Sequence, residues 1–267
     1  MATGREFLRD AWNAVLGKLW SVMTKGMPSL LDQAIAAHGG MKLWRELNRL
    51  RVRFSAGGLL FVSKWKRHAL HDIDGLIDLS RPRTAVLSPY PGPGQRGVFE
   101  PDRVWVESED GTILKERRDP RESFRGLRRA LWWDHLDVLY FAGYALWNYL
   151  CAPFLFAEPG FVSEEIEPWD EENERWRRLR VMFPPPVPTH CREQVFYFDA
   201  RTLLRRLDYT PEVVGKWARA AHYCFDHKVF AGLMVPTRRR VVPRRPDDRA
   251  RVGPTLVWIE IKDVVAE

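Results

Sequence analysis

The sequence predicts an α+β fold, in which a long antiparallel meander of strands, arranged as a sandwich or an open barrel, packs against helices. Three observations indicate this order. Helical periodicity leads the chain up to residue 47, and segments with a two-residue apolar period follow at residues 50–118 and 161–264. An uncharged aromatic segment lies between these two runs of predicted strands. Because single strands do not alternate with single helices, a parallel sheet built of βαβ units is not expected.

The first predicted helix lies within residues 1–27, where apolar side chains recur every three or four positions between residues 5 and 24. The acidic residues Glu6 and Asp10 weaken the cationic face that an anionic membrane would attract. We therefore expect this helix to dock on the rest of the chain. Peripheral membrane contact through residues 5–24 is the alternative.

Residues 28–267 are expected to form a single domain with a helical insertion at residues 120–157. Ser29 is the predicted N-cap of the first helix of this domain, because a hydroxyl there can accept a hydrogen bond from the first helical turn. The apolar run at residues 59–66 follows a double glycine, so it is predicted to be the second strand of the meander.

The aromatic segment from Leu131 to Phe156 is the most unusual stretch of the chain. It has no formal charge from Val138 onward, and roughly 20 apolar residues are enough to cross a bilayer. Its tyrosines, tryptophans and Asn148 carry polar groups throughout, however, and Pro153 breaks its end. A spanning helix concentrates its aromatic rings at the two membrane interfaces. We therefore interpret the segment as a pair of buried helices inside the fold rather than as a membrane span.

The charge of the chain requires nucleic acid to be considered as a partner. The net charge is +7 and the isoelectric point is near 9.5. The basic residues are scattered along strand-like segments, where alternation places them on a solvated face. Neither a helix-turn-helix, a zinc finger nor an aromatic RNA-binding motif accompanies them. No nucleic-acid partner is therefore expected.

The cysteines indicate a reducing compartment. Cys151, Cys191 and Cys224 are far apart, odd in number and set among apolar residues, which is typical of reduced packing residues. Residues 1–26 interrupt every apolar run with charged or polar side chains, unlike a secretory signal. The expected location is the cytoplasm.

The entry into the meander has a distinctive order. A helix ends in the sequence AHGG at Ala37–Gly40, a short helical turn with Trp44 follows, and the long meander interrupted by helices comes next. This order resembles the LolA/LolB lipoprotein-carrier superfamily. The resemblance implies an open antiparallel half-barrel of about 10–11 strands curved around a hydrophobic cavity, with the aromatic helices as a plug over the concave face.

Four residues are candidates for acid–base catalysis. His222 is the first, because it shares a predicted strand face with small side chains that leave room for a ligand, and histidine titrates near neutral pH. His190 begins the strand after a proline-rich connector, and Tyr209 lies in the next predicted strand. Asp137 lies at the start of the aromatic segment. The alternatives are a hydrogen-bonded core histidine for His222 and a helix cap for Asp137.

Metal and cofactor sites are not expected. His68 and His71 lie close in sequence, but a strand would send them to opposite faces. HExxH, paired CxxC and GxSxG motifs are absent, and the prolines in the loop at residues 89–94 remove the amide donors that a phosphate-binding loop needs.

The many aromatic residues predict a pocket, because rings with one polar edge commonly line small-molecule sites. Core packing is the alternative for each ring taken singly. We therefore predict a binding protein for a small hydrophobic or amphipathic molecule, and the alternative is an enzyme that uses His, Asp and Tyr side chains on a ring-shaped or acyl substrate. The predicted ligand-binding rings are Trp65, Trp105, Trp132, Trp133, Tyr140, Tyr144, Trp147, Tyr197, Trp217 and Tyr223.

Overall fold

The first half of the sheet is a meander of six strands that follow one another along the chain. We describe a computed structural model of the protein at residues 28–79 and 84–267; the helix predicted within residues 1–27, with its membrane alternative, lies outside these residues. Each strand pairs antiparallel with the next. The strands are β1 (Arg49–Gly57), β2 (Leu70–Asp78), β3 (Thr84–Ser88), β4 (Gln95–Glu100), β5 (Arg103–Ser108) and β6 (Ile113–Arg118).

The second half of the sheet is an antiparallel meander of seven strands. The proline-rich connector at residues 184–188 lies between two of these strands and belongs to neither, because proline cannot donate to a strand ladder. The strands are β7 (Val162–Glu171), β8 (Glu174–Met182), β9 (Glu193–Phe198), β10 (Leu204–Tyr209), β11 (Ala220–Phe230), β12 (Leu233–Pro243) and β13 (Val257–Ala266).

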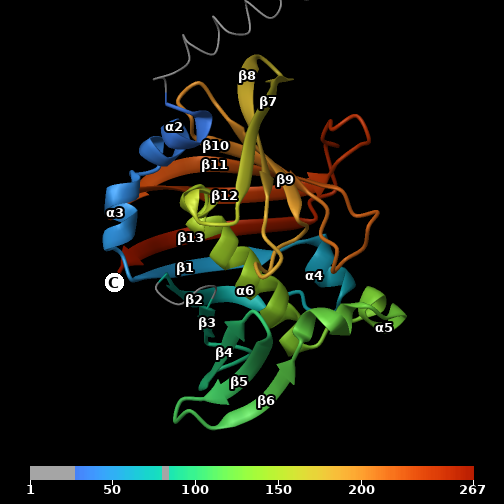
Figure 1. Cartoon of the computed structure of the whole chain (residues 1–267). Helices are drawn as coiled ribbons and strands as arrows, with labels where there is room; N and C mark the ends of the chain where they lie inside the picture. Colours follow the sequence, from blue (N-terminus) through green and yellow to red (C-terminus); the bar gives the residue numbers. More distant parts are fainter. Residues whose placement is uncertain (1–27, 80–83) are drawn as a thin grey trace, which may run out of the picture.

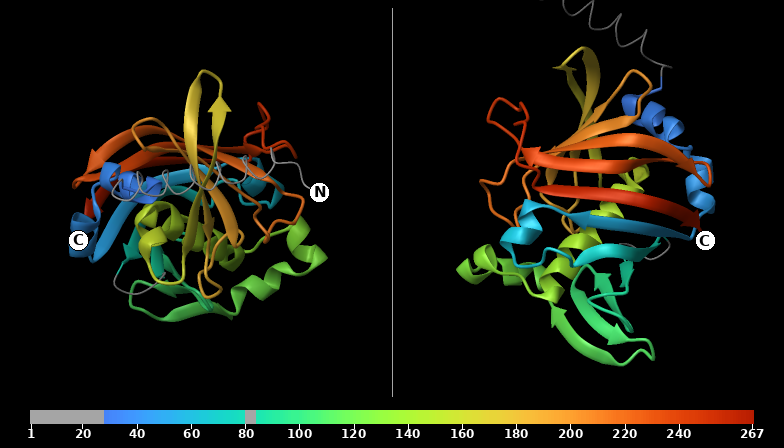
Figure 2. Two further views of the ribbon diagram at one scale, coloured as in Figure 1. Left: turned by 45° about the horizontal axis from the view of Figure 1, so that its top comes forward. Right: turned by 180° about the vertical axis from the view of Figure 1, so that it is seen from behind.

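The two meanders join where the first strand pairs with the last. β1 and β13 are antiparallel from Leu50 opposite Ala266 to Gly57 opposite Trp258. This pairing makes one open sheet of 13 strands in the described residues, in the order β6-β5-β4-β3-β2-β1-β13-β12-β11-β10-β9-β8-β7. The sheet curves around the helices on one face (Figures 1 and 2). The predicted open half-barrel is confirmed, and its strand number exceeds the expected 10–11.

Short helices close the ends of the half-barrel. α2 (Leu30–Ala37) starts at the predicted N-cap, where the Ser29 hydroxyl accepts from the Asp32 amide and Asp32 bonds back to the Ser29 amide. The carbonyl of His38, just past its end, accepts from the Met234 amide and ties the helix to β12. The short helix α3 (Met41–Glu46) follows before β1 begins.

Residues 59–66 are not a strand as predicted, because Leu59–Ser63 forms the helix α4. Gly58 leaves the sheet with φ +123°, and a side chain there would lie 2.5 Å from the Leu256 carbonyl oxygen. The amides of Leu59 and Leu60 then bond to the carbonyls of Thr255 and Leu256. The chain turns across the end of the sheet because these bonds hold it beside the start of β13.

Residues 120–157 contain the helices on the inner face of the sheet. They are η1 (Pro120–Phe124), α5 (Leu127–Leu131), α6 (His135–Cys151) and η2 (Phe154–Ala157). The sequence predicts two buried helices here, whereas the structure has one long helix and a short 3-10 turn. Proline 153 accounts for the difference, since its ring cannot continue an α-helix and Ala152 already has extended backbone angles.

Helix α6 lies across the inner face of the curved sheet (Figure 1). It contacts β3, β4 and β5 on one side, and its side chains are buried on all faces except for Tyr149 and the first residue, which are partly exposed. An uncharged helix of this kind is stable in water only when it is enclosed on every side. No helix of residues 28–79 and 84–267 is long and apolar enough to cross a membrane.

Substitution of Gly143 tests the close contact between α6 and the sheet. A Cβ at this position would lie 2.4 Å from Cγ and 2.5 Å from Cβ of Phe99 in β4. Alanine favours a helix by about 1 kcal/mol over glycine, but overpacking a rigid contact costs about 1–3 kcal/mol. Because Phe99 is fully buried and cannot move aside, the overpacking cost is at the upper end of this range, and we expect Gly143→Ala to lower the free energy of unfolding by about 1–2 kcal/mol, measured by urea denaturation. Gly92→Ala, where no atom lies within 4 Å, is the control. An unchanged midpoint in Gly143→Ala would contradict the close approach.

Candidate functional site

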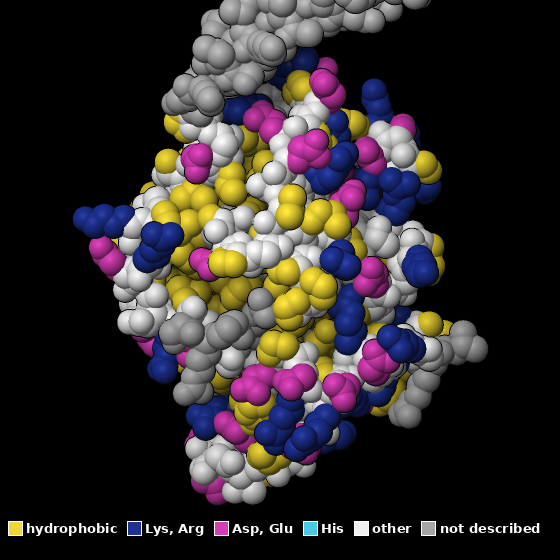
Figure 3. All heavy atoms as spheres, in the orientation of Figure 1, with side chains coloured by type: hydrophobic (Ala, Val, Ile, Leu, Met, Phe, Trp, Pro, Cys, Tyr) yellow, Lys and Arg dark blue, Asp and Glu magenta, His cyan; other side chains and the backbone are white. Residues whose placement is uncertain are grey.

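An apolar cavity lies between α6 and the central strands of the sheet. The lining side chains leave about 550 Å³ unoccupied by atoms, including the mouth, of which about 40 Å³ admits the centre of a water-sized sphere. Little of this space is therefore wide enough for a water molecule. Hydrophobic side chains gather around α6 in the middle of this face, with charged groups around them (Figure 3). The apolar lining residues are Phe54, Ala56, Phe61, Leu70, Phe141, Ala142, Ala145, Leu146, Leu150, Val257, Ile259 and Ile261.

Three polar side chains complete the cavity wall, namely Tyr149, Tyr209 and Arg239. They come from α6, β10 and β12, so the site exists only when the helix and the sheet are assembled. The hydroxyl groups of Tyr149 and Tyr209 lie 3.2 Å apart. The guanidinium carbon of Arg239 lies 5.0 Å from the centre of the Tyr149 ring. One part of an otherwise apolar cavity is thus polar and positively charged.

The two tyrosines belong to a continuous chain of buried hydrogen bonds. The hydroxyl of Tyr144 lies 3.0 Å from Nδ1 of His190, and Nε2 of His190 lies 2.6 Å from the hydroxyl of Tyr149. The chain continues through Tyr209, whose hydroxyl lies 3.2 Å from Nδ1 of His222. The His190 ring also stacks on Tyr209 with centres 4.0 Å apart. Five side chains from helix, connector and strands therefore hold one another in fixed orientations.

Two of the proton arrangements that satisfy every bond in this chain run in a single direction throughout. In the first, each group donates toward His222: Tyr144 to His190, His190 to Tyr149, Tyr149 to Tyr209, and Tyr209 to His222. Nε2 of His222 then carries a hydrogen. In the second, every bond runs the other way and Nε2 is an acceptor. In both arrangements this buried Nε2 has no hydrogen-bond partner in the described residues.

Burial keeps both imidazoles neutral. It lowers the pKa of His190 to about 3, and the positive charge of Arg121 acts in the same direction. Burial also lowers the pKa of His222 well below its usual value, with the charge of Arg239 adding to the effect. The same enclosure raises the pKa of the Tyr209 hydroxyl. The chain is therefore uncharged near neutral pH, and the guanidinium of Arg239 is the charge beside it.

Three of the four predicted catalytic residues lie together in this chain. His190, Tyr209 and His222 are all fully or nearly fully buried, and Tyr209, which lines the cavity, contacts both histidines. Asp137 is elsewhere, two helical turns before Tyr144 at the start of α6. The structure thus separates a histidine–tyrosine cluster from a carboxylate that the sequence grouped with it.

Asp137 is part of a helix cap and an ion cluster. Its carboxylate accepts from the amide of Asp134, while Asp134 accepts from the amide of Asp137. The guanidinium groups of Arg117 and Arg129 lie 2.7 and 2.6 Å from its two oxygens. Burial raises the pKa of Asp137, although these two cations oppose the shift. All of its acceptor capacity is used within the protein, as the capping alternative requires.

The predicted ligand-binding rings divide into three groups by position. Tyr144 belongs to the buried chain, and Trp133, Tyr140 and Trp147 pack in the core around α6 without lining the cavity. Trp65 and Trp217 are each 80% exposed. These two rings therefore do not wall an internal pocket.

The remaining predicted rings lie on the outer face or at the surface. Trp105 donates to Glu107 and stacks under Arg103, and Trp132 lies near Lys66 and Arg129. Tyr197 and Tyr223 are on the opposite face of the sheet from His222, because neighbouring strand residues point to opposite faces. They do not contact the cavity.

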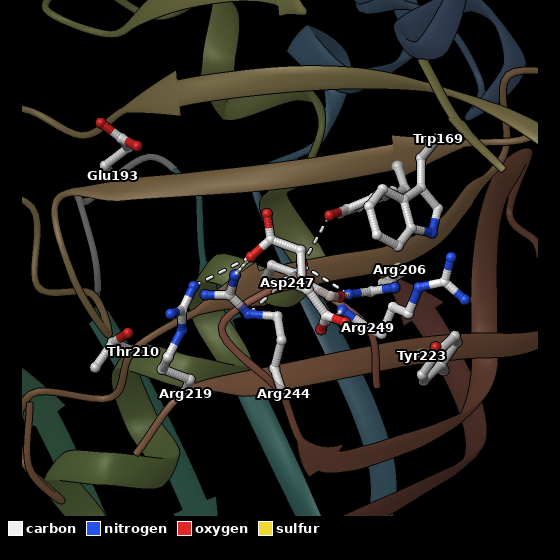
Figure 4. Close-up of polar contacts among 12 residues, drawn as sticks. Trp169, Glu193, Arg206, Thr210, Arg219, Tyr223, Arg244, Asp247 and Arg249 are labelled. Atoms are coloured by element: carbon white, nitrogen blue, oxygen red, sulfur yellow. Dashed lines mark hydrogen bonds and ion pairs between the residues drawn. The ribbon is translucent and has the colours of Figure 1, made fainter. Parts of the chain in front are cut away.

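Tyr197 and Tyr223 enclose a buried arginine on that outer face. The guanidinium of Arg206 lies 4.7 Å from the Tyr197 ring and 5.4 Å from the Tyr223 ring, and Trp169 lies beside it (Figure 4). Arg206 donates two hydrogen bonds to Asp208, at 2.7 and 2.8 Å. This arginine is fully paired, so the outer cluster is a closed structural network.

Sequence reasoning missed two residues of the site, Tyr149 and Arg239. Tyr149 joins the two halves of the hydrogen-bond chain, and Arg239 supplies its charge. Arg239 is the middle residue of three consecutive arginines in β12. Strand alternation requires that residue to face away from its two neighbours, and this signal could have found it. In the residues that the structure describes, no three His, Cys, Asp or Glu side chains are placed to hold a metal ion.

An open antiparallel half-barrel with an inner helix and a cavity between them defines a LolA-like fold. No protein-family model matches the chain, and no curated protein matches its sequence. A solved LolA superfamily protein from Nitrosomonas europaea is similar to it with a TM-score of 0.50 and 9% identity, over 89% of this chain and 92% of that one. At this identity the likeness establishes the fold, as the sequence resemblance predicted.

Two further solved structures are similar over comparable lengths. A DUF1329 family protein from Desulfovibrio piger has a TM-score of 0.49 and 10% identity, over 89% of this chain and 92% of that one. An outer membrane lipoprotein-sorting protein domain from Vibrio parahaemolyticus has a TM-score of 0.49 and 6% identity, over 89% and 91%.

The buried histidines predict an acid-sensitive fold. The unfolded chain binds a proton at each histidine below about pH 6.5, whereas folded His190 binds one only near pH 3. The unfolded state thus holds more protons in this window. The free energy of unfolding therefore decreases as the pH is lowered, by about 1.4 kcal/mol per pH unit for each such group. We expect His190→Gln to reduce the slope between pH 6 and 5 by about 1 kcal/mol per unit in urea titrations. His68→Gln, at an exposed position, is the control. An unchanged slope in His190→Gln would mean that folded His190 takes up a proton.

Proposed function

We propose that the protein binds a hydrophobic or amphipathic small molecule in the cavity between α6 and the sheet. The observation that carries this proposal is an apolar cavity that ends at a cluster of polar groups. Ligand sites are commonly mostly apolar, with a few fixed polar groups that orient the ligand. A carrier on this scaffold would hold the apolar part along Phe54, Phe141 and Leu146, and the polar part near Tyr149 and Tyr209.

The narrow cavity limits the shape of the ligand. The space that admits water-sized spheres is about 40 Å³, while about 550 Å³ is free of atoms around the same side chains. Binding therefore requires the lining side chains to rotate, and a single flexible chain can follow the space that they open. Several lining residues are alanines on α6 and β1, which face the cavity without filling it.

Neutral imidazoles favour binding over catalysis. A general base works best when its pKa is near the working pH, and burial puts the pKa of His190 at about 3. Burial and the charge of Arg239 also hold the pKa of His222 well below its usual value. In the ligand-free protein these groups are hydrogen-bonding partners rather than proton acceptors.

Filling the cavity tests the proposal. Ala145 lies on α6 and lines the cavity, so Ala145→Leu places three more carbons in it. We expect this variant to weaken binding of the neutral fluorescent probe N-phenyl-1-naphthylamine by about tenfold or more, since overpacking opposes entry. Ala200→Leu, at an exposed position, is the matched control and should bind like the original protein. If Ala145→Leu binds the probe as tightly as the original protein does, with an unchanged melting temperature, the probe does not bind in this cavity and the proposal fails.

A second function is favoured by the hydrogen-bond chain itself. Its last atom, Nε2 of His222, is buried and unpaired in the described residues, and a chain of this kind can pass a proton between its ends. An enzyme using His222, His190 and Tyr209 on an acyl or ring-shaped substrate would exploit that property.

The two functions differ in their response to His222→Gln. For a carrier, we expect this variant to bind the neutral naphthylamine probe with nearly unchanged affinity, and lipid extract incubated with the protein to return with unchanged masses. For an enzyme, mass spectrometry would detect converted molecules, and the variant would lower the conversion rate by roughly 100-fold or more. If the original protein converts lipid molecules and His222→Gln does not, the protein is an enzyme and the carrier proposal fails.

The proposal also places the protein in the cytoplasm, as the cysteine pattern indicates. The thiols of Cys151, Cys191 and Cys224 are free, and those of Cys151 and Cys224 are buried in the core. Disulfide bonds are rare in reducing compartments, and these thiols support such a location.

A further inference from the structure

Arg239 is a buried cation that has no counter-charge within residues 28–79 and 84–267. Its side chain is 2% exposed, and among the described residues no Asp or Glu forms an ion pair with it. Its guanidinium donates to the sulfur of Cys224 and to the carbonyl of Tyr149, both at 3.3 Å. These neutral acceptors replace little of the hydration that a cation loses on burial. Burial of the Arg239 charge is therefore costly.

Arg239 and His222 each have an unpaired nitrogen, and both side chains are on the inner face of the sheet. Nε of Arg239 and Nε2 of His222 are both buried without a hydrogen-bond partner in the part of the chain that the structure describes. Both residues lie on the inner face of the sheet, on the neighbouring strands β12 and β11, and Arg239 lines the cavity. Arg239 thus brings an unpaired donor to the wall of the apolar cavity, and the unpaired His222 lies beside it on the next strand.

Arg206, a buried arginine with a structural role, differs from Arg239 in having carboxylate partners. Arg206 is also fully buried, but on the outer face, and Asp208 and Glu171 neutralise it at 2.7 and 3.0 Å (Figure 4). The described residues supply carboxylates for Arg206 and none for Arg239. An external anion would complete Arg239 in the way that Asp208 completes Arg206.

We propose that Arg239 binds the head group of an anionic single-chain amphiphile, a long-chain carboxylate, whose chain lies in the cavity beneath α6. This inference rests on the proposed binding function and adds the chemical class of the ligand. One carboxylate oxygen takes the vacant Nε–H of Arg239. In the proton arrangement that leaves a hydrogen on Nε2 of His222, that N–H is available to the other oxygen.

Charge and width select a carboxylate with one chain. A monoanion balances the single charge of Arg239, whereas a phosphate monoester, with a charge near −2 at pH 7, leaves an excess negative charge beside neutral imidazole. The narrow cavity has room for one thin chain rather than two.

The first test compares three ligands on the unaltered full-length protein. Palmitate, 1-hexadecanol and hexadecyl phosphate share a 16-carbon chain and differ in head group. The affinity of each ligand is measured by its displacement of N-phenyl-1-naphthylamine at pH 7.5. Each ligand is kept below the concentration at which it aggregates. We expect palmitate to bind on the order of 10- to 100-fold more tightly than hexadecanol, as charged hydrogen bonds require, and more tightly than hexadecyl phosphate. Equal affinities of palmitate and hexadecanol, or preference for the phosphate, would overturn the inference.

The second test removes the charge. Arg239→Met keeps a long side chain, and we expect it to erase the preference for palmitate over hexadecanol while leaving hexadecanol affinity within about twofold. Loss of an uncompensated buried charge should leave the melting temperature unchanged or higher. Arg240→Met is the matched control, because it removes the same charge from the next residue of β12 on the exposed face. A preference for palmitate that survives in Arg239→Met contradicts the role of this residue.

The outcomes separate this inference from the binding function. If neither palmitate nor hexadecanol displaces the probe, and the probe itself does not bind, the binding function fails and the inference fails with it. If both ligands bind equally well, the binding function stands and the anionic head group is excluded.

Discussion

Enclosure of α6 is the constraint on which the rest of the structure depends. The helix carries no charge from Val138 to its end, so none of its faces can be left in water at low cost. The 13-stranded sheet curves around it, and glycines on both sides let backbone and side chains approach closely, as at Gly143 against Phe99 and at Gly97 against Leu139. The charges that the helix lacks are gathered at its start, where Asp134 and Asp137 meet two arginines.

The same enclosure explains why the histidine–tyrosine chain is continuous. A polar group sealed from water must find a partner inside the protein, or it costs about 1–3 kcal/mol. Tyr144 and Tyr149 enter from α6, whereas Tyr209 and His222 enter from the sheet, and His190 bridges the two sets. The chain thus fastens helix to sheet in an interior that is otherwise apolar. At the sheet end of the chain, Nε2 of His222 is buried without a hydrogen-bond partner in the described residues.

The sequence predicted the order of the elements well, because it depends on local periodicity. The helix cap at Ser29 and the alternation that separates His222 from Tyr223 follow from short-range rules, whereas the open half-barrel was implied by the family resemblance. The same alternation places Tyr197 and Tyr223 on the outer face, so the prediction that they line the pocket conflicts with it. Trp65 and Trp217 show a further limit, since ring size alone does not fix burial. Arg239 was missed because a run of arginines was interpreted as one solvated face.

The pairing of β1 with β13 has a consequence for how the chain is made. About 200 residues separate Gly57 from its partner Trp258. At a ribosomal rate of roughly 5–20 residues per second, that interval takes roughly 10–40 s. Throughout it, one edge of β1 lies open on the nascent chain, in a hydrophobic strand capable of pairing with another polypeptide. The middle of the finished sheet is therefore its last part to pair, and an exposed edge persists there until β13 has been made.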